Sequence, residues 1–144
     1  MSSRSEIVRK AIFAKSNVAA VVGSGKLTAI FSDKAGENPS FPYGVFQRQA
    51  PVPTVYAFGY TPVQEEDLWL FKVYADKDSS TTKEPQELCE DLLDTWLSTL
   101  GHDLTLSGAT VAWMAKFNDV PPLDEKQSNR FVYGRGTLMR IVTE

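Results

Sequence analysis

The clearest pattern of hydrophobic and polar residues lies in two consecutive segments, residues 67–76 and 85–100. The first segment is aromatic and β-branched and contains no glycine or proline, which is typical of a β-strand. Its alternation gives two apolar faces: Trp69, Phe71, Val73 and Ala75 on one, and Leu68, Leu70 and Tyr74 on the other. We therefore expect a central strand covered on both sides, with Lys72 as the one charge that must reach out or pair.

The second segment has the spacing of an amphipathic helix. Its apolar stripe consists of Leu88, Cys89, Leu92, Leu93, Trp96, Leu97 and Leu100. Thr81 and Glu84 have the spacing of a capping box, Pro85 suits a first turn, and Gly101 suits a left-handed stop. The helix is expected to pack on the preceding strand and to form the core with it.

Weaker patterns complete the chain. They predict a helix at 5–20, strands at 27–31, 43–49, 104–106 and 110–117, and one bent strand or two at 131–142. Residues 51–67 are expected to form a long loop or a distorted hairpin arm, and residues 119–130 an irregular polar segment. The order α-β-β-β-α-β-β predicts a single α+β domain over residues 1–144, with two main helices and a mostly antiparallel sheet.

Composition narrows the function classes. The chain has 144 residues, 42% of them hydrophobic, and a net charge of −3. This balance argues against a sequence-wide affinity for nucleic acid, which requires clustered Lys and Arg. The longest apolar run, residues 18–22, is too short to cross a membrane. We expect no membrane association.

Motifs for catalysis, metal or cofactor binding are weak. Residues 22–26 resemble a phosphate loop but lack its first glycine and its Ser or Thr. The single cysteine, Cys89, lies in the helical stripe, and the single histidine, His102, lies beyond the helix end. An enzyme that uses this pair is the weakest of the alternatives, and we expect no catalytic residues, no metal site and no cofactor.

The connection before the central strand is unusually aromatic. Tyr56, Phe58 and Tyr60 alternate between Pro53 and Pro62. If these rings are exposed, they form an adhesive surface. The alternative is that they fold back over the sheet as a lid.

Several segments in a fixed order carry a resemblance to a known family: 20–23 (AVVG), 41–48 (FPYGVFQR), the strand 68–75, the helix sequence 87–93 (ELCEDLL) and a terminal aliphatic strand. In spacing and hydrophobicity they resemble the tail-terminator (tail-completion, minor tail) proteins of long-tailed bacteriophages. The resemblance spans nearly the whole chain.

The resemblance implies a structural virion protein rather than an enzyme. Such subunits form a ring, commonly of six, on the end of the tail tube, stop its growth and join the tail to the head or neck. The implied partners are other copies of the chain, the tail tube protein and a neck or head-completion protein, while DNA passes through the lumen without sequence-specific binding. The implied location is the virion tail, and the host cytoplasm during assembly.

As a hypothesis, Tyr56, Phe58 and Tyr60 contact a neighbouring subunit or the tube, with Arg130 and Arg135 as charged partners. The alternative from another class is a soluble monomeric binding module. In that case, an apolar pocket is expected beneath Trp69, Trp96 and Trp113.

Overall fold

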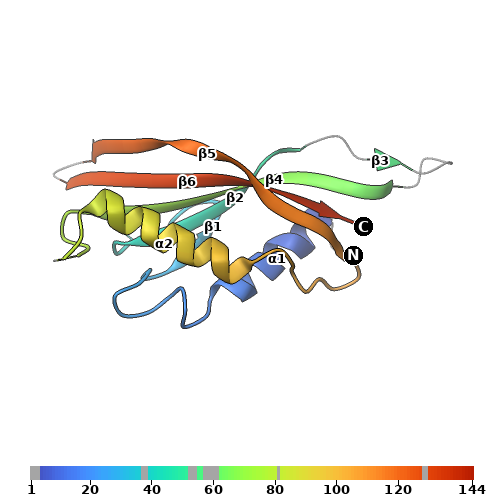
Figure 1. Cartoon of the computed structure of the whole chain (residues 1–144), viewed down its shortest axis with the longest axis horizontal. Coiled ribbons are helices and arrows are strands. Elements are labelled where there is room, and N and C mark those ends of the chain that lie inside the picture. The colour runs from blue at the N-terminus through green and yellow to red at the C-terminus, as the bar shows by residue number, and fades with distance from the viewer. Residues whose placement is uncertain (1–3, 37–38, 52–54, 57–61, 81, 128–129) are drawn as a thin grey trace.

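The computed structural model describes residues 4–36, 39–51, 55–56, 62–80, 82–127 and 130–144 (Figure 1). The elements are α1 (Arg4–Ser16), β1 (Ile30–Ser32), β2 (Tyr43–Pro51), β3 (Val55–Tyr56), β4 (Pro62–Asp76), α2 (Pro85–Leu100), β5 (Val111–Gln127) and β6 (Arg130–Thr143). The predicted α+β class and the order α-β-β-β-α-β-β are confirmed, with the two-residue β3 as an addition.

The strands form one sheet in the order β1-β2-β4-β6-β5, and β3 pairs with β4. Only β1 and β2 run parallel; the other pairs are antiparallel. Strand β4 lies between β2 and β6, so its predicted central position is confirmed. It begins at Pro62, which makes the segment before Asp67 a hairpin arm rather than a long loop.

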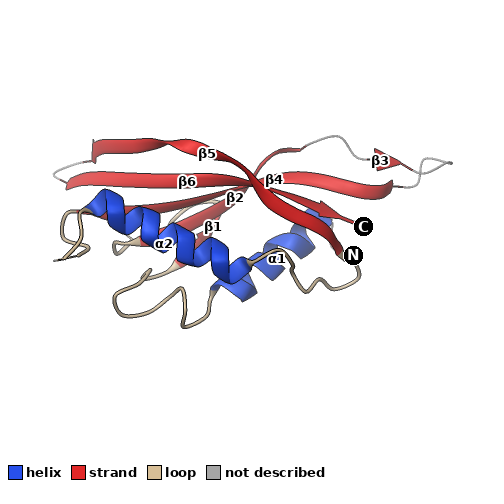
Figure 2. Ribbon diagram, viewed as in Figure 1, coloured by secondary structure: helices blue, strands red, loops and turns tan. Residues whose placement is uncertain are grey.

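Both helices lie on the same face of the sheet (Figure 2). Helix α2 packs on β4 and β6, and α1 packs against α2 and β1. The expectation that β4 is covered on both sides is therefore wrong for the single chain. We call the face beneath the helices the covered face and the opposite one the open face.

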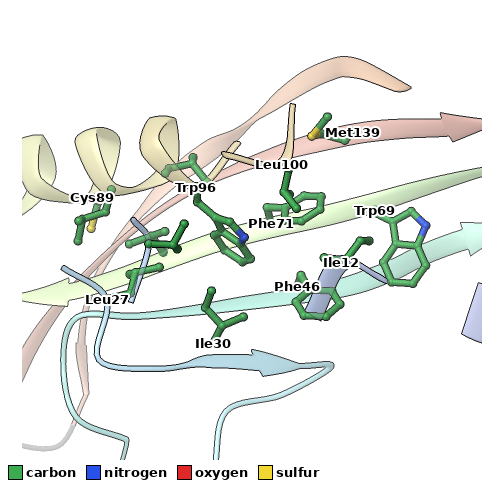
Figure 3. Packing of buried hydrophobic residues seen from close by; sticks show 14 of the residues in the cluster. Ile12, Leu27, Ile30, Phe46, Trp69, Phe71, Cys89, Trp96, Leu100 and Met139 are labelled. Carbon is green, nitrogen blue, oxygen red and sulfur yellow. The ribbon is translucent and has the colours of Figure 1, made fainter. Parts of the chain in front are cut away.

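The core fills the space between the helices and the covered face (Figure 3). The four β4 residues predicted for one face are all buried, as is most of the α2 stripe. The Trp96 ring meets the Phe71 ring edge-on, with centroids 5.1 Å apart. Its Nε1 donates a hydrogen bond of 2.7 Å to Ser16 Oγ at the end of α1. The two helices and the sheet therefore pack together around Trp96 in one close-packed core.

The ends of α2 show which predicted signals act. Pro85 is in the first turn, and Gly101 takes a positive φ of 65° while its N–H donates to Leu97 O. Thr81 of the predicted capping box lies outside the described residues, and Glu84, which the box would put inside the helix, comes directly before it and makes no side-chain capping bond. Lys15 of α1 instead reaches the other end of the helix, where its Nζ donates to Leu100 O and to a neighbouring carbonyl.

Three further boundaries differ from the sequence prediction. Helix α1 ends at Ser16 rather than continuing to residue 20. Residues 104–106 form no strand, since Leu104 and Leu106 pack on the core as irregular backbone. Strand β5 continues through Pro121 and Pro122 to residue 127, where an irregular segment was expected.

Two features explain the long β5–β6 pair. Strand β5 is at the sheet edge, where prolines are tolerated because no ladder bond is needed on one side, and its register shifts between Val120 and Leu123. Strand β6 is continuous through Gly134 and Gly136. A Cβ on Gly136 would lie 3.0 Å from Lys72 Cγ, so glycine here makes room for a neighbouring side chain rather than a bend.

Candidate interaction surface

Strand register defines the open face row by row. One row runs from Tyr43 through Tyr74 and Gly134 to Leu123. The next row contains Val45, Lys72, Gly136 and Val120. The third contains Gln47, Leu70, Leu138 and Asn118. Directly paired residues point to the same side of a sheet, so these side chains share the face that carries no helix.

An aromatic cluster occupies the first row. The Tyr43 ring lies 5.2 Å from that of Tyr74, 5.1 Å from Phe41 and 5.9 Å from Phe31, between centroids. Burial raises the pKa of the Tyr43 phenol, and the neighbouring Tyr74 raises it further. The cluster therefore forms an apolar, poorly hydrated wall at this end of the face.

Beside this wall the open face is hollowed, with a cavity volume of about 290 Å³. Its lining includes Val45, Leu70 and both tyrosines, with Lys34 and Lys72 as the cations. Lys72 is half-buried, and within the described part of the chain it has no ion-pair partner. A cation in this position, on the central strand and beside apolar side chains, is the most distinctive feature of the face.

Two large rings are exposed farther along the same face. Trp113 pairs with Val142 and is 45% exposed, and Phe117 is 49% exposed. The Arg140 guanidinium lies 4.7 Å from the centre of the Phe117 ring and forms an ion pair with Glu66. Large exposed rings beside a paired arginine are typical of protein interfaces.

A second hollow, of about 970 Å³, lies on the helix side, between α2 and the β5–β6 pair. Several of its charges pair within the chain: Arg135 Nη1 lies 3.0 Å from Asp124 and Arg135 Nε 3.7 Å from Glu90, while Lys116 lies 2.8 Å from Asp119. The Lys116 bond lowers the pKa of Asp119. Arg135, predicted as a partner for another subunit, is thus already engaged inside its own subunit.

The remaining predicted contact residues are not placed. Phe58 and Tyr60 lie outside the described residues. Tyr56 and Arg130 have described backbones, in β3 and β6, but their side chains lie outside the description. Their proposed contact roles therefore stay predictions.

The structure separates the two residues of the enzyme alternative. Cys89 is fully buried on α2, and burial raises the pKa of its thiol to about 12. Its Sγ donates to Tyr133 O at 3.4 Å. His102 is exposed beyond the helix end and lies 3.3 Å from Met114 O. A nucleophilic cysteine requires the opposite shift and a nearby base.

The three tryptophans do not enclose a shared pocket either. Trp69 and Trp96 are buried in the core on the covered face, whereas Trp113 lies on the open face. The pocket expected beneath all three is occupied by packed side chains on the helix side (Figure 3).

Sequence reasoning missed Phe117 and the hollow at Lys72. The alternation of residues 110–117 separates Trp113 from Met114 and puts Phe117 on the side of Trp113, but the sequence does not show that this side is the open face, which depends on the pairing of β5 with β6. In the residues that the structure describes, no group of acidic, cysteine or histidine side chains is arranged to hold a metal ion. No described helix has the length and hydrophobicity to span a membrane.

No model of a known protein family matches the chain, and no curated protein is significantly similar to it.

Proposed function

We propose that this protein is a structural subunit that assembles into a ring at the end of a bacteriophage tail tube, stops tube growth and joins the tail to the head or neck. The observation that carries the proposal is the open face of the sheet. It is rich in apolar side chains, exposes Trp113 and Phe117, and carries no helix. Burying such rings against another chain is favourable by about 25 cal/mol per Å² of apolar surface.

Ring formation suits this surface. Identical subunits that bury one face against a different surface of the next copy form a closed ring when the rotation closes. The long hairpin of β5 and β6 presents Trp113 and Phe117 at the sheet edge, where a neighbouring copy has access. The proposed ring has six copies, as the resemblance to tail terminators implies.

The charge of the subunit agrees with a DNA passage. The net charge is −3 and the isoelectric point is about 5.2. A lumen lined by Lys and Arg would retain the phosphates, whereas an acidic ring lets DNA pass without specific binding. The tail tube protein and a neck or head-completion protein are the proposed neighbours along the tail axis.

A monomeric binding module is the alternative, and one observation favours it. The hollow beside Lys72 combines apolar side chains, such as Val45 and Leu70, with the polar groups of Lys34 and Lys72, as small-molecule sites do. A monomer that retains a small anionic ligand through purification would support this alternative over the ring.

The test is the native mass of the purified chain, followed by electron microscopy of the assemblies. We expect rings for the wild type and a folded monomer for the double variant Trp113→Ser and Phe117→Ser. Val18→Ser, which also removes an exposed apolar side chain, is the matched control and should assemble. A wild-type chain that stays monomeric, both alone at its highest soluble concentration and with tail tubes, would contradict the proposal.

A further inference from the structure

We infer that the hollow on the open face receives the acidic outer surface of helix α2 from a second copy of the chain, with Lys72 as the charge that it binds. This inference rests on the proposed ring, because it identifies the two surfaces that join neighbouring subunits. Three features support it: the charges of the two surfaces, their positions on the subunit, and the hydrophobic pattern of β4.

On the sheet side, the hollow has an excess of positive charge. Lys34 and Lys72 line it, together with Asp33. Two ammonium groups against one carboxylate leave this lining with a net positive charge. The Lys72 stem lies across Gly136, where a Cβ would meet Cγ at 3.0 Å. The inner part of the Lys72 stem is therefore packed against β6.

On the helix side, α2 carries an excess of negative charge. Its outer surface has four carboxylates: Glu87, Glu90, Asp91 and Asp94. Lys83 pairs with Asp91, and Arg135 lies near Glu90 but also pairs with Asp124. Glu87 and Asp94 are exposed and add further charge to this surface. An acidic helix against a hollow with two lysines is an electrostatically complementary pair.

The two surfaces cannot meet within one chain, because α2 and the open face lie on opposite sides of the sheet (Figure 2). Contact between copies is therefore heterologous, with each chain using its helix surface toward one neighbour and its open face toward the other. Such stacking places a helix on each face of every sheet. It gives the second apolar face of β4 a helix layer as well, since both helices of the single chain lie on the other face.

The inference predicts a charge-swap experiment. Variant S carries Lys34→Glu and Lys72→Glu, and variant H carries Glu87→Lys and Asp94→Lys, which leaves the ion pairs of Asp91 and Glu90 intact. In each variant alone the two surfaces have the same sign. Since facing like charges cost several kcal/mol, we expect self-association to weaken by at least about tenfold in each.

An equal mixture of the two variants should assemble again. The acidic open face of S fits the basic helix of H, and the unchanged open face of H fits the unchanged helix of S. Native mass spectrometry should therefore find even-numbered assemblies with equal copies of the two variants. Lys10→Glu, which reverses an exposed lysine on α1, is the matched control and should assemble like the wild type.

Two results would overturn the inference. One is wild-type assembly by S or H alone. The other is a mixture that stays monomeric although both variants unfold cooperatively; the neutral variant Lys72→Gln replaces S if S does not fold. If the wild type forms rings and either result is found, these contact surfaces are wrong but the proposed ring is not. A wild type that stays monomeric, both alone and with tail tubes, would refute the ring itself.

Discussion

The two faces of the central sheet have similar sequences and different surroundings. On β4, the covered face presents Trp69 and Phe71 and the open face presents Leu70 and Tyr74. The covered face meets two helices and reaches complete burial, with Trp96 wedged among aromatic rings. The open face is protected only by its own side chains and the adjoining loop. Apolar residues on both faces of a strand therefore indicate that both faces favour burial. They do not show whether the same chain or a second chain covers each face.

Removing a ring from each face tests this difference most strongly. Phe71→Ala should lower the free energy of unfolding by about 3–5 kcal/mol, because the cavity it leaves is enclosed by fixed neighbours. Phe117→Ala on the open face should change it by less than about 0.5 kcal/mol, because the ring is half-exposed. Denaturant unfolding of the monomer measures both. Equal losses would show that the open face is part of the core.

The thiol on the covered face gives a second test. Cys89 should react with thiol reagents at pH 8 at least about a hundredfold more slowly than an unfolded cysteine, because burial raises its pKa to about 12. Ser98→Cys adds an exposed thiol on the same helix and should react rapidly. Rapid labelling of Cys89 in the folded wild type would contradict the dry core.

The raised pKa of Cys89 also makes the stability of the folded protein depend on pH. A folded pKa above the unfolded value of about 9 means that the unfolded thiol ionises first as the pH rises. The contribution of Cys89 to stability is therefore complete below pH 9 and declines as the pH rises toward 12. The variant Cys89→Ala should lack this part of the alkaline decline.

The tightness of the covered face predicts the effect of a single methyl group. A Cβ on Gly44 would lie 2.9 Å from the Trp96 ring and 3.2 Å from Leu27. Gly44→Ala should therefore cost about 1–3 kcal/mol of unfolding free energy through overpacking. Gly36→Ala is the control, because its Cβ would meet Phe31 at an ordinary 3.5 Å. Equal stabilities of the two variants would show that the Trp96 contact is loose.

The smallest effect concerns the attachment of one helix to the other. Lys15→Met removes two hydrogen bonds from Nζ to carbonyls at the end of α2 but keeps most of the apolar stem. We expect a loss of about 1 kcal/mol, since the ammonium group is partly hydrated. Lys10→Met on the exposed side of α1 should have almost no effect. If the two variants unfold alike, Lys15 does not hold the helix layer together.

Much of the fold is readable from the sequence because its central elements have strong periodicity. The β4 alternation and the α2 stripe give the core, and Pro85 and Gly101 give the helix ends. The prediction of an irregular segment at 119–130 is wrong because β5 is an edge strand, which tolerates its two prolines. The sequence does not show which strand is at the edge. The bend predicted within residues 131–142 is absent, because Gly134 and Gly136 make room for Tyr74 and Lys72 of the neighbouring strand β4.

The interaction surface is less readable, because it depends on pairing between distant strands. Lys72 stands out in the sequence as a charge in an apolar strand, but its hollow forms from residues of β2, β4 and β5 and the loop after β1. Trp113 and Phe117 are visible as alternate residues of one strand, whereas the pairing with β6 that puts them on the open face is not. Long-range register has no local signal.

Tryptophan quenching by acrylamide tests most directly whether another copy covers the open face. The chain has three tryptophans, of which Trp69 and Trp96 are buried and Trp113 is exposed. We expect one quenchable tryptophan in dilute monomer and loss of that quenching on assembly, with no such change in Trp113→Phe. An assembled protein in which Trp113 is as quenchable as in the monomer would contradict the account.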